Sequence, residues 1–517
     1  MDLGTLIPQF LPEFVLLGAG LLILLGERVG LERREYFGAL SLAGMLLAFL
    51  LVAADLGTPG MGGLRGVSAG QVDGAAIPGA LYGFSSLGLW FQEFFLLAAG
   101  LVALAFLSRP SVERGAAVSY ALLIFATLGM LLVTLAADLV YLLLALEITA
   151  ISSYLLVGYT RRDPRGLEAA MKFYIIGALS AALSFFGASL LFGAYGTTSL
   201  SVIGHSWPSG SGGLASAGYA FLLVGLGFEV TAVPFHMWAV DVYDGAPDEV
   251  SAFLAGGTKK VGLFAFVLLF TVPLLLVGSL SSATGSARES IQLSLVVLAL
   301  LTMTLGNLLA LLQPEMKRLL AYSSISQAGY MLLGIAVGTA PALTGASLQI
   351  LAHVLLKTGA FLVVAAVSAL GIGPLVADWR GLGVRRPYLS AAFALFLLGL
   401  AGIPLTVGFV SKFVLFSALV QAEGWFLWLA VAGLLNSALS VFYYARILKT
   451  MYVDKSPTAE ETAPARSGEP LGADGLGWGR AGAIALAAVA VVALGVYPQP
   501  VLGALGTAAQ HFLSLGL

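Results

Sequence analysis

Apolar residues run through this 517-residue chain in blocks of about 20, and this pattern constrains its fold more than any other feature. A helix of that length crosses a hydrocarbon core of about 30 Å. Hydrophobic residues make up 59% of the chain and charged residues only 10%, too few to cover a soluble protein of this size. The first block, Leu6 to Gly26, lacks a preceding basic stretch and a cleavage site, so we expect it to remain as an uncleaved span.

Thirteen further blocks of this kind follow along the chain. They cover 37–55, 86–107, 116–135, 138–159, 168–195, 214–239, 249–275, 289–312, 318–338, 343–370, 388–420, 424–451 and 480–503. The sequence therefore predicts an all-α integral membrane protein of about fourteen transmembrane helices.

The 25 lysines and arginines test this assignment. Eighteen fall in loops after odd-numbered spans: Arg28, Arg33, Arg34, Arg109, Arg114, Arg161, Arg162, Arg165, Lys317, Arg318, Arg380, Arg385, Arg386, Arg446, Lys449, Lys455, Arg466 and Arg480. Loops after even-numbered spans hold only Arg65 and Arg288. By the positive-inside rule the odd loops are cytoplasmic, so both termini are expected on the periplasmic side of a bacterial plasma membrane. Five basic residues remain within or beside the spans: Lys172, Lys259, Lys260, Lys357 and Lys412.

Composition excludes several kinds of site. The chain has no cysteine, so we expect no disulfide, thiolate-bound cluster or Cys-based zinc site in it. Its four scattered histidines make no metal-ligand pattern, and a net charge of −2 gives no sign of nucleic-acid binding. Residues 56–85 and 454–479 are expected to be flexible surface loops. The run GMGGLRG from Gly60 lacks the preceding strand that a phosphate-binding loop requires.

Two charged residues mark the fifth and sixth spans. Glu147 is about ten residues from either end of its span, at a depth where a charge costs at least about 2.5–3.5 kcal/mol. Such a residue lies beside a partner or a water-filled cavity, and a purely structural ion pair is the alternative to a transport role. Lys172 lies near the start of its span, four residues after Glu168, so it could instead reach the membrane surface.

Pro234 predicts a break in the seventh span, because proline removes a backbone donor and frees a carbonyl one turn earlier. Glu229 comes just before it and His236 just after it. Broken helices at membrane depth are tolerated where they line a cavity, although a kink that only shapes packing is possible here. In the eighth span, Lys259 and Lys260 are consecutive and so point about 100° apart; at most one can point squarely along an internal path.

The second half of the chain repeats this combination of proline and charge. His353 and Lys357 share a helix face at i, i+4, a pair suited to proton relay, although each could simply be a buried polar residue. Pro404 predicts a break in the twelfth span, with Lys412 about two turns later. A structural ion pair is the alternative for Lys412. Paired broken helices in the two halves of a chain indicate an inverted-repeat transporter.

Four ordered segments resemble subunit N of respiratory complex I, the proton-translocating NADH:quinone oxidoreductase. They are LEITAISSYLLVGYTRRDPRGLEAAMKFYIIGALSAA, PFHMWAVDVYDGAPDEVSAFLAGGTKK, KRLLAYSSISQAGYMLLG and GIPLTVGFVSKF. This antiporter-like family implies fourteen helices with two inverted five-helix repeats and with helices 7 and 12 broken. The implied parts are helices 1–3 in 1–115, the first repeat in 116–275, the second in 289–451, a cytoplasmic loop in 452–479 and helix 14 in 480–517.

The resemblance also implies roles for individual residues. Glu147 would modulate a neighbouring lysine, and Lys172, Lys259 and Lys412 would be the lysines of the sixth, eighth and twelfth helices. Two departures stand out. The family usually has a lysine where this chain has Glu229, and the His353–Lys357 pair is more typical of the other antiporter-like subunits. One hypothesis is that Glu147 and Glu229 share a proton, with Lys172 or Lys260 supplying positive charge.

We therefore expect a proton-conducting membrane-arm subunit of complex I, with protonation moving between Lys172, Lys259, Lys357 and Lys412. Its expected surroundings are lipid, water and the other membrane-arm subunits. NADH, FMN, iron–sulfur clusters and quinone are expected in partner subunits, with no cofactor or metal in this chain. The alternatives are a subunit of a cation/proton antiporter or membrane-bound hydrogenase, or a structural membrane-arm protein that conducts nothing.

Overall fold

The computed structural model describes residues 8–30, 34–57, 81–108, 115–159, 164–206, 212–271, 285–455 and 476–515. Within these ranges the chain is helical apart from turns and three isolated β-bridges. Twelve helices there are long and apolar enough to cross a membrane. The integral-membrane, all-α class is thus confirmed, whereas the count of fourteen, the two inverted repeats and the domain boundaries stay predictions.

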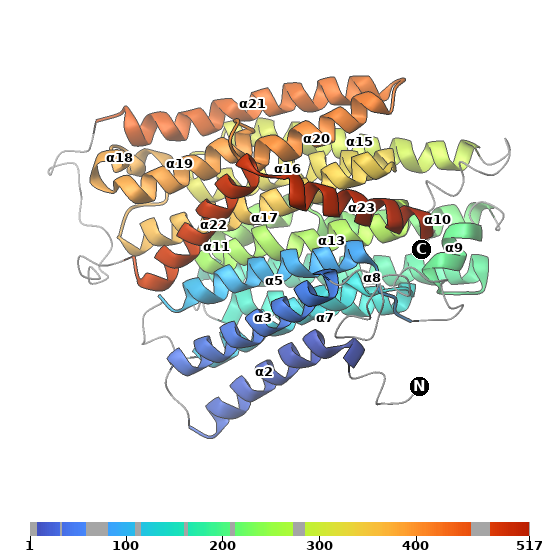
Figure 1. Ribbon diagram of the computed structural model, residues 1–517, viewed down its shortest axis with the longest axis horizontal. Helices are drawn as coiled ribbons and strands as arrows, with labels where there is room; N and C mark the ends of the chain where they lie inside the picture. The colour runs from blue at the N-terminus through green and yellow to red at the C-terminus, as the bar shows by residue number, and fades with distance from the viewer. Residues whose placement is uncertain are drawn as a thin grey trace.

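The helices lie side by side as a bundle, with their long axes running in broadly the same direction (Figure 1). In chain order the long helices of the first half are α2 Leu11–Arg28, α3 Arg34–Gly57, α5 Ser86–Phe106, α6 Ala116–Thr134, α7 Leu139–Tyr159, α8 Pro164–Tyr195 and α10 Gly212–Glu229. Shorter helices α9 Leu200–Ser206, α11 Met237–Gly245, α12 Asp248–Phe253 and α13 Lys259–Phe266 lie among and after them. The second half contains α15 Gly285–Leu311, α16 Met316–Val337, α17 Ala340–Ala369, α18 Leu382–Arg385, α19 Pro387–Ala401, α20 Val407–Gln421, α21 Phe426–Tyr452, α22 Trp478–Val496 and α23 Gln499–Leu515.

Both predicted helix breaks are present. The seventh span divides into α10 and α11, separated by residues 230–236, and the twelfth divides into α19 and α20, separated by 402–406. A proline lies in each gap, where it cannot continue the helical hydrogen bonding. The last predicted span, 480–503, is also divided, because α22 ends at Val496 and α23 begins at Gln499, with Pro498 between them. The expectation of one continuous fourteenth helix was therefore wrong.

The eighth span contains an irregularity that the hydrophobic pattern did not predict. Between α12 and α13 the chain forms a π-helical turn, Leu254–Thr258, and a second one, Val267–Thr271, follows α13. The first turn packs closely against α17, since a Cβ at Gly256 would lie 1.9 Å from the Thr358 hydroxyl oxygen. Such turns occur frequently at functional sites, and this one directly precedes Lys259.

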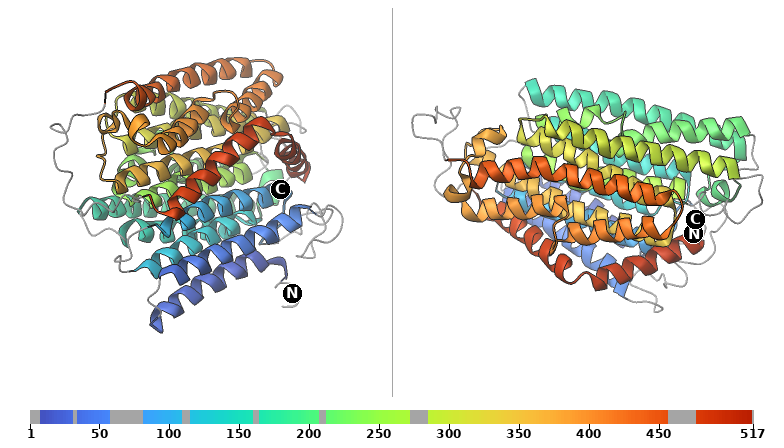
Figure 2. Two further views of the ribbon diagram at one scale, coloured as in Figure 1. Left: turned by 60° about the vertical axis from the view of Figure 1, so that its left-hand side comes forward. Right: turned by 90° about the horizontal axis from the view of Figure 1, so that it is seen from above.

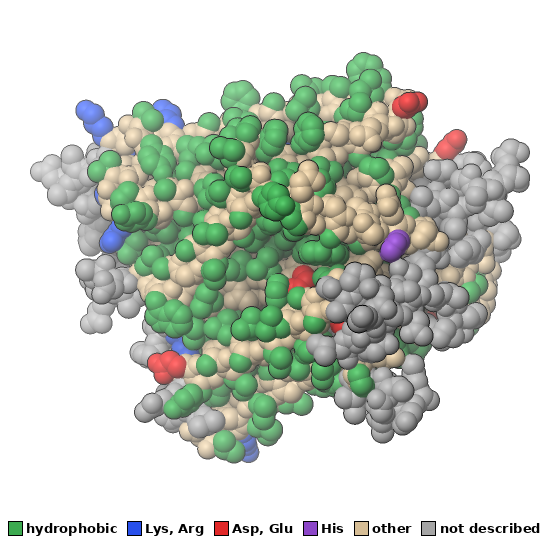
Figure 3. Space-filling view, viewed as in Figure 1, with side chains coloured by type: hydrophobic (Ala, Val, Ile, Leu, Met, Phe, Trp, Pro, Cys, Tyr) green, Lys and Arg blue, Asp and Glu red, His purple; other side chains and the backbone are tan. Residues whose placement is uncertain are grey.

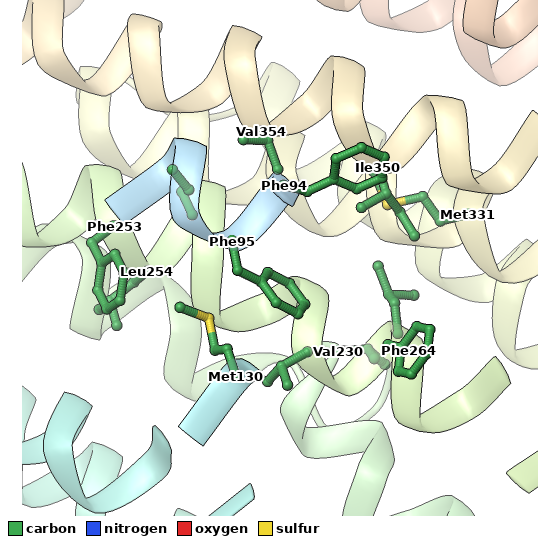
Figure 4. Packing of buried hydrophobic residues seen from close by; sticks show 14 of the residues in the cluster. Phe94, Phe95, Met130, Val230, Phe253, Leu254, Phe264, Met331, Ile350 and Val354 are labelled. Carbon is green, nitrogen blue, oxygen red and sulfur yellow. The ribbon is translucent and has the colours of Figure 1, made fainter. Parts of the chain in front are cut away.

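The centre of the molecule is occupied by the spans that carry the deep lysines. Residues 248–271 and helix α17 are almost wholly buried, whereas α8, α21 and α22 lie at the periphery. Apolar side chains from α5, α6, α12, α16 and α17 surround this centre, among them Phe95, Met130, Phe253, Met331 and Val354 (Figure 4). Lysines on these two spans therefore face protein rather than lipid.

The outer surface is a broad apolar band. Figure 3 shows hydrophobic side chains across the middle of one face, with the visible Lys and Arg side chains along its left and lower margins. Helix α2 begins and α23 ends on the right in Figure 1, and the rotated views agree on this placement (Figure 2). Most of the two predicted loops lies outside the described residues, as do Arg33, Arg65, Arg109, Arg114, Arg161, Arg162 and Arg466.

Candidate proton-conducting site

Lys259 is a buried lysine whose amine forms no hydrogen bond to the described residues. It follows the π-helical turn directly, and its residue is only 3% exposed. Within the described ranges its Nζ atom has no hydrogen-bond partner and lies 5.6 Å from the centroid of the Tyr243 ring. A ring face attracts a cation but does not replace the hydrogen bonds of water. The site therefore holds an amine that can accept or release a proton without first breaking a hydrogen bond to protein.

Lys260 is also buried but is bound by the backbone. Its Nζ donates to the Ala255 carbonyl oxygen at 2.5 Å, within the turn that precedes it. The two consecutive lysines thus differ as the helical geometry predicts: one is held by its own helix and the other is not. This difference favours Lys259 as the lysine on an internal path.

Lys357 and His353 lie on one face of α17, opposite α16. The Lys357 Nζ donates to the Leu320 carbonyl oxygen at 2.8 Å and to the Ser323 hydroxyl at 2.7 Å. His353 Nε2 lies 3.4 Å from the Ser324 hydroxyl. The pair also interacts electrostatically with Lys260 across the helix interface. The structure therefore brings three lysines and a histidine together at the centre of the bundle.

The second helix break provides the site for Lys412. Helix α19 ends at Ala401, and the Lys412 Nζ donates to the freed carbonyl oxygens of Leu400 at 2.8 Å and Ala401 at 3.2 Å. It also donates to the Ser437 hydroxyl at 2.9 Å and lies 5.2 Å from the Tyr330 ring centroid. Helix carbonyl ends carry partial negative charge, which suits an ammonium group.

No carboxylate of the described residues forms an ion pair with any of the four buried lysines that the sequence predicts within the spans, Lys259, Lys260, Lys357 and Lys412. Their partners there are hydroxyls, carbonyl oxygens and ring faces. The structural ion pair that was the alternative for Lys412 is thus absent from this part of the chain. A low-dielectric interior disfavours the charged form of an amine that has no carboxylate partner, so such an amine releases a proton more readily than one in an ion pair.

The first helix break carries Glu229, one of the two acids that the sequence predicts to act as a pair. Glu229 is the last residue of α10, and its Cβ packs against Gly262 of α13. The Glu147 and Glu229 carboxylates interact electrostatically with each other and with Tyr154. His236 caps the start of α11, and its Nδ1 is buried without a hydrogen-bond partner among the described residues. The geometry is therefore compatible with the predicted carboxyl pair.

Lys172 lies apart from the buried row. Its side chain is 41% exposed and forms ion pairs with Glu168 and Asp241, both at 2.8 Å. Asp241 also pairs with Arg318 at 3.0 Å. These residues line a polar cavity of about 190 Å³ that includes Arg165 and Asp244. The structure thus places Lys172 at a charged cleft of the molecular surface. This agrees with the alternative, considered from the sequence, that Lys172 reaches the membrane surface.

The sequence did not predict several polar residues near the buried lysines, because their side chains are neutral. Ser323, Gln327, Gln349, Ser411 and Ser437 form hydrogen bonds around the buried lysines. A buried ion pair, Arg480–Glu249 at 2.7 Å, joins α22 to α12 and was also not predicted. The signal that could have revealed Ser323 and Gln327 is the unusual density of hydroxyl and amide residues in YSSISQAGY, inside an apolar span.

Residues 136–440, which contain all of the buried lysines, match the family described as NADH:quinone oxidoreductase/Mrp antiporter, transmembrane. The chain belongs to this family. It is 37% identical to F(420)H(2) dehydrogenase subunit N of Methanosarcina mazei, with 95% of each chain covered. It is 36% identical to NADH-quinone oxidoreductase subunit N 2 of Sorangium cellulosum, with 97% of each covered. The resemblance to subunit N is thereby confirmed.

Solved structures of the family agree with this assignment. A chain of respiratory complex I from Thermus thermophilus aligns with a TM-score of 0.74 and 30% identity, covering 96% of this chain and 99% of that one. A chain of the Mrp complex from Dietzia sp. aligns with a TM-score of 0.81 and 21% identity over the whole of both chains, which indicates a shared fold. The antiporter-like architecture of this family member is therefore supported by sequence and by shape.

Proposed function

We propose that this chain is the N-type, antiporter-like subunit of the membrane arm of a proton-translocating oxidoreductase, and that its buried lysines conduct the protons. The observation that carries the proposal is the row of Lys259, Lys260, Lys357 and Lys412 at the centre of the bundle, without carboxylate partners in the described chain. A charge at this depth costs at least about 2.5–3.5 kcal/mol, so a row of four lysines is difficult to explain by stability alone.

The electrostatics of the row suggest how a proton moves through it. Neighbouring ammonium groups in a poorly solvated interior repel one another strongly, so a proton on one lysine opposes protonation of the next. A proton that arrives at Lys259 therefore favours release further along, from Lys357 or Lys412. Lys259, which has no hydrogen bond to protein in the described ranges, takes the central exchange step. Water carries the proton where side chains do not meet.

The two carboxylates and the charged cleft take part at one end of the row. Glu147 and Glu229 share a proton, and its gain or loss alters the field felt by the adjacent lysines. Lys172, with Asp241 and Arg318, forms the mouth through which protons reach the bundle from the side that carries the basic loops. On this topology both termini lie on the opposite, outer side of the membrane.

Redox chemistry belongs to partner subunits in this proposal. The relatives include enzymes named for NADH and for F(420)H(2), so the same type of subunit occurs with different electron donors. NADH, FMN, iron–sulfur clusters and quinone would be bound outside this chain. Among the described residues no cluster of three or more His, Asp or Glu could hold a metal ion.

The test is to purify the chain from its native membranes with its partners and reconstitute the assembly into liposomes. We expect quinone reduction by NADH or reduced F420 to acidify one compartment, without a requirement for sodium. Recovery in an assembly that exchanges sodium for protons without redox activity would favour the antiporter alternative, which the fold shared with the Mrp complex also allows. Pumping that is unaffected when the buried lysines are replaced would favour a purely structural subunit.

A further inference from the structure

Two of the buried lysines are joined by side chains that carry no charge. Lys357 lies on α17 and Lys412 on α20, and each amine donates to a hydroxyl: Lys357 to Ser323 at 2.7 Å and Lys412 to Ser437 at 2.9 Å. A proton that leaves one lysine for the other has to cross the region where α16, α19 and α21 meet. The groups found there determine whether it can.

Ser323 and Tyr444 form the first part of this connection. The Ser323 hydroxyl, which accepts from Lys357, is also hydrogen-bonded to the Tyr444 hydroxyl. Both residues are buried, at the interface of α16 and α21. A hydroxyl can accept one proton while it donates another, so two hydroxyls in series form a short path for protons. The path begins at the amine of Lys357.

Gln327 forms the second part. It lies one turn after Ser323 on α16, where its side chain interacts with that of Tyr444. Its Nε2 donates at 3.2 Å to the Leu400 carbonyl oxygen, which also accepts from Lys412 at 2.8 Å. The orientation of this amide is set from the other side, because Gln349 Nε2 donates to Gln327 Oε1 at 2.8 Å. Ser411 in turn donates to Gln349 Oε1 at 2.6 Å.

An amide held in this way does not carry protons, because its oxygen already accepts one hydrogen bond and its NH2 group already donates another. Its contribution is to hold the Tyr444 hydroxyl near the carbonyl end of α19, where Lys412 binds. The hydroxyls of Ser323 and Tyr444 can therefore transfer a proton. The amides of Gln327 and Gln349 cannot, and they instead hold the neighbouring groups in position.

We infer that Ser323 and Tyr444 carry the proton between Lys357 and Lys412, with Gln327 as a positioning residue; this inference rests on the proposed function. The Lys357 ammonium gives a proton to the Ser323 oxygen, and the Ser323 hydroxyl proton passes to the Tyr444 oxygen. The Tyr444 phenol proton moves through one water molecule to the neutral Lys412 amine. One proton leaves Lys357 and one reaches Lys412, and both hydroxyls are regenerated.

The test uses the whole assembly in liposomes and measures protons moved per quinone reduced. Tyr444→Phe and Ser323→Ala each remove one hydroxyl with little change of shape. We expect proton movement to fall at least about tenfold, since a positioned acid–base group typically contributes about 10²–10⁴-fold. Ser323→Thr keeps a hydroxyl and should restore most of the activity. The matched control is Tyr195→Phe, since this buried hydroxyl has no partner in the described chain and lies at the end of α8.

A structural role and a failure of the proposed function give different results. If Ser323→Ala and Ser323→Thr are impaired equally, or if Tyr444→Phe pumps like the unmodified assembly, the relay is overturned. A larger solvent deuterium effect on pumping in Tyr444→Phe, with unchanged subunit content, supports it. If Lys259→Ala also pumps normally, the proposed function itself is wrong; if Lys259→Ala abolishes pumping while Tyr444→Phe does not affect it, only the relay is wrong.

Discussion

The two broken helices are interrupted in the same way, but the residue at the first break is an acid and the residue at the second is a lysine. At the first, α10 ends at Glu229, whose carboxylate interacts electrostatically with Glu147. At the second, α19 ends at Ala401, and Lys412 returns to bind the freed carbonyl oxygens. In both breaks one residue other than glycine adopts a left-handed conformation, Thr231 at φ 56° and Leu405 at φ 70°. The backbones are thus alike where the chemistry differs.

The difference shows how one fold supports two kinds of site. The carbonyl end of a helix is partially negative, so it stabilises the ammonium of Lys412 directly and repels the carboxylate of Glu229. Glu229 stands where the family resemblance leads one to expect a lysine. In the proposed function, a proton shared with Glu147 relieves that repulsion. The first break therefore depends on protonation of an acid, whereas the second depends on hydrogen bonds to a lysine.

Removal of the amine at the second break is expected to have the largest effect. Lys412→Met keeps the length of the side chain and removes every hydrogen bond that the amine makes to Leu400, Ala401 and Ser437. We expect redox-coupled proton movement to fall at least about tenfold. Lys449→Met is the control, because Lys449 is 68% exposed on α21 and pairs only loosely with Asp454 at 3.7 Å. Equal pumping by the two variants would show that the second break is not on the path.

The matching change at the first break is Glu229→Gln, which retains the shape of the carboxyl group and removes its proton exchange. We expect a several-fold loss of pumping, smaller than that of Lys412→Met, because Glu147 can still titrate. The measurement is pumping against pH, compared with Glu289→Gln at an exposed position on α15. A pH profile identical to that of the unmodified assembly would exclude Glu229 as a titrating group.

Two glycines test how tightly each break is packed. A Cβ at Gly408 would lie 2.0 Å from the Gly399 carbonyl oxygen, whereas one at Gly262 would lie 2.7 Å from the Glu229 Cβ. Gly408→Ala must therefore shift backbone, and we expect it to destabilise the chain by roughly 1–3 kcal/mol, more than Gly262→Ala. Thermal unfolding in detergent measures both, with Gly100→Ala as control because nothing lies within 4 Å of that position. The reverse order would contradict the packing described for the breaks.

The surface ion pairs that hold α11 should contribute least. Asp241→Asn removes the shared partner of Lys172 and Arg318, and exposed pairs of this kind contribute about 0.2–1 kcal/mol each. We expect a small loss of stability that disappears at high salt, and less than a twofold change in pumping at neutral pH. A loss of pumping as large as that of Lys412→Met would show that the Asp241 carboxylate itself transfers protons and does more than line the mouth of the path.

Much of the fold could be predicted because its signals are local. Apolar block length and the positions of Pro234 and Pro404 predicted the spans and both breaks, which the structure contains. The depth of Lys259, Lys357 and Lys412 followed from their distance to the ends of their spans, since charges at membrane depth turn inward. These inferences needed no knowledge of which helices are neighbours.

The remaining features depend on contacts between distant segments. Lys172 was placed on the proton path by resemblance, but its position beside Asp241 depends on how α8 packs against α11. The chain from Lys357 through Ser323 to Tyr444 joins three helices, and no sequence period indicates their proximity. The π-helical turn before Lys259 depends on close packing between Gly256 and Thr358. Tertiary packing rather than local pattern decides each of these cases.

The most direct test of the conducting lysine row is proton movement by an assembly that carries Lys259→Ala. The matched variant is Lys449→Ala, an exposed lysine on the outer helix α21. With subunit content and quinone reduction measured in parallel, we expect Lys259→Ala to lose proton movement at least about tenfold while Lys449→Ala retains it. Undiminished protons per quinone reduced in Lys259→Ala would contradict the conclusion that the buried lysines conduct.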